Sequence, residues 1–121
     1  MNKLNLTKAI KIENKESKST LFEVMGLTGP IVNESCSIAL THIQPGGGVI
    51  RHKHLESEET YIFISGSAEM VVNGETLAVT AGDTVVIHAG DIHELKQVGP
   101  EGIDFYAITI PPYVEEDFIV V

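Results

Sequence analysis

Turn signals recur at short intervals along this chain and limit the length of every regular element. They combine glycine with proline, asparagine, aspartate or serine, and they lie at residues 28–30, 44–48, 65–67, 73–74, 81–83, 89–91 and 98–100. The runs between them are short and rich in apolar and β-branched residues, and none has a helical period. This arrangement is typical of an all-β sandwich or barrel.

The apolar runs between these turns define the predicted strands. Asn73-Gly74 is the strongest hairpin signal and predicts a type I′ turn with both central residues at positive φ. Ser65-Gly66-Ser67 is expected to separate two strands. The predicted strands are residues 20–26, 35–43, 49–54, 59–65, 68–73, 75–80, 84–87, 93–98 and 103–110.

A chain of 121 residues has the size of one domain. We expect the barrel to occupy residues 19–114, with Pro111-Pro112 ending its last strand. Residues 1–18 should form a strand and a polar loop, the strand lying at a sheet edge or exchanged with a second subunit. Exchange would cover exposed edges, so we expect a homodimer. The tail 115–121, EEDFIVV, should pack on the barrel or on the partner.

Composition excludes several classes of partner. Seventeen acidic against eight basic side chains give a formal charge of −9, which repels nucleic acid. No signal peptide is recognisable, and no apolar run approaches the roughly 20 residues that span a bilayer. A single cysteine, Cys36, suits a reducing compartment. We therefore expect a cytoplasmic protein without nucleic-acid or membrane partners.

Three potential metal ligands lie close together in the sequence. His52 and His54 alternate with charged residues in a predicted strand, so both imidazoles point to one face, and Glu59 follows five residues later. His93 can join them. Three nitrogen donors and one oxygen donor accept zinc, iron, manganese, nickel or copper. We expect one divalent transition metal per chain, of undetermined identity.

Two motifs surround these residues. The first comprises Gly46, His52, His54, Glu59 and Gly66, and the second comprises Gly82, Gly90 and His93. They resemble the two motifs of the cupins. Both have the family's glycine and ligand spacings, although the second has His88 and Gln97 where cupins carry proline and asparagine. The chain is thus similar to small single-domain cupins, which implies a double-stranded β-helix, or jelly-roll barrel, with the metal inside.

Other side chains are expected near the metal because alternate residues of a strand point to the same face. Tyr61 and Phe63 should therefore lie on the face of Glu59, and Gln97 should lie on the face of His93. His42 shares the parity of larger apolar residues in its strand, which places it in the interior. We assign Tyr61 and His42 as candidate catalytic residues and Gln97 and Phe63 as candidate substrate-binding residues. The alternative is that Tyr61 and His42 are satisfied core residues.

Four protein ligands leave two positions of an octahedral site open, as a catalytic metal requires. The first functional hypothesis is an enzyme acting on a small oxygenated metabolite such as a sugar, keto acid or enediol. Its chemistry would be Lewis-acid isomerase or lyase catalysis, or iron-dependent dioxygenation. The alternative is a non-catalytic, metal-dependent module that binds or senses a small molecule.

Overall fold

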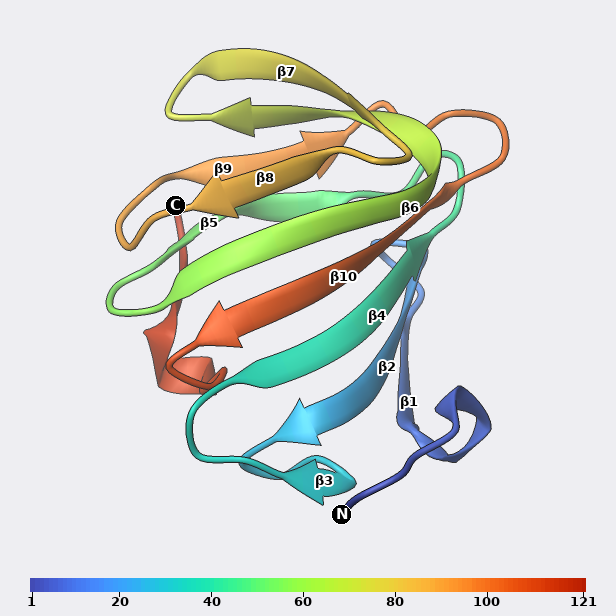
Figure 1. Ribbon diagram of the computed structural model, residues 1–121. Helices are drawn as coiled ribbons and strands as arrows, with labels where there is room; N and C mark the ends of the chain where they lie inside the picture. The colour runs from blue at the N-terminus through green and yellow to red at the C-terminus, as the bar shows by residue number, and fades with distance from the viewer.

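The computed structural model describes residues 1–121 and is built almost entirely from β-strands, as expected (Figure 1). No helix is long and apolar enough to cross a membrane. Two 3₁₀ helices, η1 (Leu6–Lys8) and η2 (Glu115–Asp117), flank the barrel. The strands are β1 (Ile10–Asn14), β2 (Ser19–Gly26), β3 (Ile31–Val32), β4 (Ser37–Ile43), β5 (Val49–His54), β6 (Glu58–Val72), β7 (Glu75–Thr80), β8 (Thr84–Ile87), β9 (His93–Lys96), β10 (Ile103–Ile110) and β11 (Phe118–Val120).

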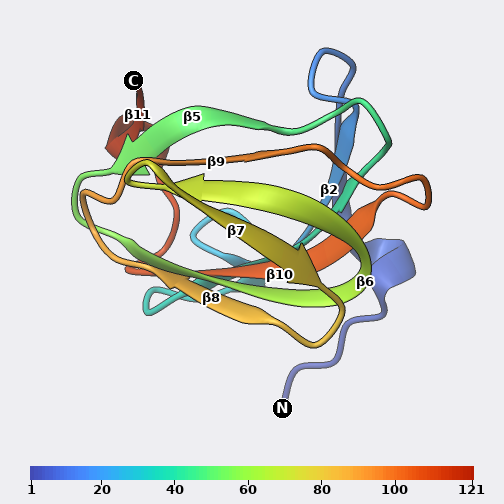
Figure 2. The ribbon, with the colours of Figure 1, turned by 90° about the horizontal axis from the view of Figure 1, so that it is seen from above.

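The strands pair into one strongly curled sheet. Their order is β1-β2-β4-β10-β6-β9-β5-β11, with β3 paired to β2 and both β7 and β8 paired to β6. Seen from above, β5 and β9 lie opposite β8 and β10 across the interior (Figure 2). The predicted jelly-roll barrel is confirmed.

Strand β6 joins the two halves of the barrel. Its first part pairs with β8 and β10, and its second part pairs with β7 and β9. The predicted turn at Ser65-Gly66-Ser67 is therefore wrong, because the strand continues through it. Gly66, at φ 82°, supplies the bend, and a Cβ there would overlap the carbonyl oxygen of Gly102. A turn signal in the sequence is here a kink within one strand.

The hairpin between β6 and β7 is confirmed. Asn73 and Gly74 have φ values of 49° and 81°, as a type I′ turn requires. Strand β9 is shorter than predicted, because Gln97 also has positive φ, at 53°, and turns the chain away after Lys96.

The interior of the barrel is filled by side chains from most of its strands. Tyr61, Phe63 and Phe105 pack with their ring centroids 4.6–6.1 Å apart. Fully buried aliphatic side chains surround them and complete the core; these include Ile43, Met70, Ile87, Leu95 and Ile103.

Both ends of the chain lie against the barrel. Strand β1 folds back on β2 of the same chain and forms an edge of the sheet. At the other end β10 stops at Ile110, before the two prolines, as predicted. Strand β11 then pairs with β5, placing Phe118 opposite His54 and Val120 opposite His52.

Candidate metal centre

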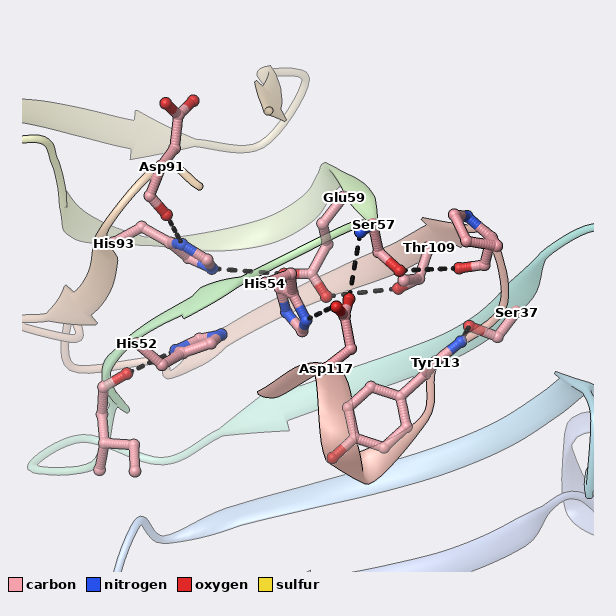
Figure 3. Close-up of polar contacts among 12 residues, drawn as sticks. Ser37, His52, His54, Ser57, Glu59, Asp91, His93, Thr109, Tyr113 and Asp117 are labelled. Atoms are coloured by element: carbon pink, nitrogen blue, oxygen red, sulfur yellow. Dashed lines mark hydrogen bonds and ion pairs between the residues drawn. The ribbon is translucent and has the colours of Figure 1, made fainter. Parts of the chain in front are cut away.

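Four buried polar side chains converge inside the barrel (Figure 3). His52 and His54 come from β5, Glu59 from β6 and His93 from β9, and their exposed fractions are all 7% or less. Pairing of β5 with β9 sets His52 opposite His93. One donor atom of each residue lies within 4.8 Å of the others. The structure therefore brings together the four residues that the sequence predicted as metal ligands.

Hydrogen bonds to backbone carbonyls orient two of the imidazoles. Nδ1 of His52 donates to the oxygen of Ile50 at 2.7 Å, and Nδ1 of His93 donates to the oxygen of Asp91 at 2.9 Å. Since Nδ1 carries the proton, Nε2 of each ring keeps its lone pair. Such outer contacts fix the tautomer that a metal needs.

The carboxylate of Glu59 lies between two of the rings. Its Oε1 is 3.5 Å from Nε2 of His54 and 3.4 Å from Nε2 of His93. The hydroxyl of Thr109 donates to Oε2 at 3.4 Å and leaves Oε1 facing the imidazoles. Neighbouring Glu58 is exposed and contacts His88 at 3.0 Å.

Burial and charge set the protonation of this cluster. Burial raises the pKa of Glu59, but hydrogen bonds and charge from His54 and His93 outweigh burial and lower this pKa to about 2. Burial lowers the pKa of His52 to about 4. Burial also lowers the pKa of His54, yet Glu59 and Asp117 outweigh this and raise it above its usual value. Glu59 is thus an anion and His52 is neutral near pH 7, the forms in which both bind metals.

The donor atoms of the cluster fit a cation. Both ring nitrogens of His54, Nε2 of His93 and Oε1 of Glu59 are buried and lack hydrogen-bond partners. Unpaired buried polar atoms are costly. A divalent ion would satisfy the three that face the centre of the cluster. His52, His54, Glu59 and His93 are therefore placed to bind a metal, whose identity the donor set leaves open.

Asp117, which the sequence analysis missed, supports this centre from the C-terminal segment. Its Oδ1 accepts from the backbone N–H of Glu56 at 2.8 Å, and its Oδ2 accepts from that of Ser57 at 3.1 Å. Oδ2 also lies 3.7 Å from Nδ1 of His54 (Figure 3). The apolar end of the tail predicted packing, but no motif identified this carboxylate.

A cavity of about 540 Å³ opens beside the cluster. Tyr61 lines it and is 3% exposed; burial, with the charge of Glu59, raises its pKa well above the usual value. Its hydroxyl is therefore a hydrogen-bond donor rather than a base. Phe118 stacks on His52 with ring centroids 4.1 Å apart. The cavity also includes Tyr113 and Phe118, which sequence parity could not place because they follow the last barrel strand.

The other predicted catalytic and substrate-binding residues lie away from the cavity. His42 was predicted to face the interior, and this is wrong: it is absent from the cavity lining and contacts Asp104 at 2.7 Å on the other sheet face. Gln97 was predicted on the face of His93, but its positive φ breaks the alternation and leaves it exposed. Phe63 is interior, as predicted, yet it packs in the core instead of lining the cavity.

Comparisons with known proteins agree with this geometry. A family model described as a cupin domain matches residues 39–109, which include all four clustered side chains. A search of curated proteins found no match.

Several solved structures share the fold. Streptomyces Pac13, described as a unique nucleoside dehydratase, is 15% identical with a TM-score of 0.77, covering 100% of this chain and 94% of that chain. The Lactobacillus farciminis oxalate decarboxylase formate complex is 26% identical with a TM-score of 0.80, covering 95% of this chain and 34% of that chain. A predicted oxalate decarboxylase from Thermotoga maritima is 19% identical with a TM-score of 0.80, covering 91% of this chain and 99% of that chain. With the cupin model matching more than half of its residues, this chain belongs to the cupin family.

Proposed function

We propose that this cupin is a metal-dependent enzyme acting on a small oxygenated metabolite, such as a sugar, a keto acid or an enediol. The observation that carries the proposal is the set of unpaired buried donor atoms beside a cavity of about 540 Å³. A structural metal site is normally closed by protein, whereas a catalytic one has access to a substrate.

Different residues of the chain would hold the metal, contact the substrate and orient the carboxylate ligand. His52, His54, Glu59 and His93 hold the ion, which when bound supplies Lewis acidity for isomerase or lyase chemistry or, as iron, activation of dioxygen. Tyr61 keeps its proton because of its raised pKa, so it would donate a hydrogen bond to the substrate. Thr109 orients the Glu59 carboxylate. Apolar walls of the cavity would exclude water.

The enzymes among the similar structures support small-molecule chemistry in general terms. One is a nucleoside dehydratase and another an oxalate decarboxylase. Their substrates differ, so the reaction proposed for this chain rests on its own site.

A second candidate is a non-catalytic, metal-dependent module that binds or senses a small molecule. It is favoured by the small number of groups available for proton transfer. Besides the clustered residues, the titratable side chains lining the cavity are Glu23, Tyr61 and Tyr113.

The test begins with the metal content of purified protein and uptake of zinc, manganese, nickel and iron. Each loaded form is then assayed with sugars, keto acids and aromatic diols, with and without dioxygen. Turnover that falls about 10²- to 10³-fold in Tyr61→Phe, with metal content unchanged, would support the enzyme. Tight binding without conversion would favour the binding module, and failure to bind any metal would exclude both.

A further inference from the structure

A row of four residues crosses the sheet beneath the cavity and connects the metal cluster with β2. Register pairs Glu23 with Ala39, Ala39 with Ala107, and Ala107 with Tyr61. All four line the cavity. Partners in register on adjacent strands point to the same face, so the two alanines form a floor between Glu23 and Tyr61.

Larger side chains lie on both sides of this floor. Leu21, Thr41 and Phe105 form the neighbouring row on one side, and Met25 and Thr109 lie on the other. The alanine row is therefore a groove. Three strand spacings separate Glu23 from Tyr61, which corresponds to about 14 Å along the sheet. Such a groove is long for a two-carbon acid and suits an elongated molecule.

The far end of the groove is negatively charged. Glu23 is half-buried, and its carboxylate has neither an ion pair nor a side-chain hydrogen bond, whereas no lysine or arginine lines the cavity. The carboxylate therefore has free acceptor capacity directed at the cavity. It would attract a donor or a cation there and repel a second anion.

We propose that this groove binds an elongated ligand whose oxygens reach the metal cluster and whose other end presents an amine or another hydrogen-bond donor to Glu23. Glu23 is then a specificity residue that disfavours ligands with a carboxylate at that end. The inference rests on the proposed function for the metal-binding end and adds the ligand's length and polarity.

The test uses the full-length, zinc-loaded protein and three six-carbon hydroxamates. Hexanohydroxamate has a methyl end, and its two analogues carry a terminal amine or a terminal carboxylate; acetohydroxamate serves as the short reference. By calorimetry we expect the amine to bind about 10-fold more tightly than the carboxylate. Glu23→Gln should remove most of this difference. Glu13→Gln makes the same charge change on neighbouring β1, where Glu13 is exposed and outside the cavity, and should preserve it.

A second variant tests the groove itself. Ala39→Leu should lower the affinity for hexanohydroxamate about 10-fold or more. Zinc stoichiometry and the affinity for acetohydroxamate should stay unchanged. Equal binding of amine and carboxylate, or undiminished hexanohydroxamate binding to Ala39→Leu, would overturn the inference but leave the metal site intact. Absence of zinc uptake would overturn both this inference and the proposed function.

Discussion

At the scale of single residues, the His54 imidazole has the most demanding environment in the centre. Nε2 faces Glu59 and Nδ1 faces Asp117, and neither nitrogen has a hydrogen-bond partner. His52 and His93, by contrast, are each fixed through Nδ1 by a backbone carbonyl. A metal would therefore order His54 more than the other two rings.

Substitutions of the clustered residues should reduce metal binding to different extents. His54→Ala or His52→Ala removes a nitrogen donor and should abolish stoichiometric binding. Glu59→Gln retains an oxygen donor, so metal binding should be weaker but detectable. Elemental analysis after dialysis and competition with a chelator measure both effects. Full metal content in His54→Ala would show that His54 is not a ligand.

Asp117 should tune the site without touching the metal. Removing its charge in Asp117→Asn takes away the anion facing Nδ1 of His54, and loss of such outer contacts typically costs about 10- to 100-fold in metal affinity. We expect about 10-fold weaker zinc binding by competition. Glu116→Gln, the exposed neighbour, is the matched control and should leave the affinity unchanged. Equal zinc affinities in the two variants would show that Asp117 only stabilises the turn at residues 56–57.

At the scale of elements, the bend in β6 sets the geometry of the barrel. Gly66→Ala would combine positive φ with overlap on the Gly102 carbonyl, whereas Gly74→Ala has similar φ but open space around its Cβ. Positive φ alone costs about 1–2 kcal/mol for a residue with a side chain. We expect Gly66→Ala to lower the free energy of unfolding by at least about 2 kcal/mol more than Gly74→Ala in urea titrations. Similar losses would mean that β10 moves aside without cost.

Strand boundaries could largely be predicted from the sequence, because alternation and turn chemistry act locally. The predicted limits of β5, β7, β8 and β10 agree with the structure, and parity placed His52 and His54 correctly. The Gly66 signal was misread because glycine permits positive φ equally in a turn and in a bent strand. Only tertiary pairing distinguishes the two.

His42 was misplaced for a different reason. The outer face of the sheet carries larger apolar groups than the cavity face, since Phe22, Leu40, Tyr106 and Ile62 form an outward row in register. Alternation identifies two faces but not which one is inside. Glu23 and Asp117 were missed because no sequence motif marks a residue brought in by long-range strand pairing.

At the scale of the whole molecule, acid should destabilise the metal-free protein through His52. Its pKa is about 4 when folded, against 6.5 for an ordinary histidine, so between these values the unfolded chain binds a proton that the folded chain lacks. The free energy of unfolding should therefore fall by about 2 kcal/mol from pH 7 to pH 5 relative to His52→Gln. Urea titrations of both proteins measure this. If the difference in free energy of unfolding between the two proteins did not change with pH, His52 would titrate normally in the folded state.

The assembly state is a separate prediction. Strand β1 is an exposed edge, and the outward apolar row is only half-buried, so both features favour contact with a second copy. We propose a homodimer in which the N-terminal strand contributes to the interface. Light scattering at low concentration should give twice the chain mass, and deletion of residues 1–18 should weaken association. A monomeric full-length protein, or a truncated dimer of unchanged stability, would contradict this arrangement.

The pairing of β11 with β5 makes the two ends of the chain unequal as attachment points for fusion partners. Phe118 and Val120 lie in register with His54 and His52, so a bulky tag joined after Val121 would pull on the strand that carries two of the clustered imidazoles. Strand β1 stands at the other end of the strand order from β11, and the N-terminus lies far from the C-terminus in Figure 1. Affinity tags, fluorescent reporters and surface-immobilisation linkers should therefore disturb the clustered imidazoles less at Met1 than at Val121.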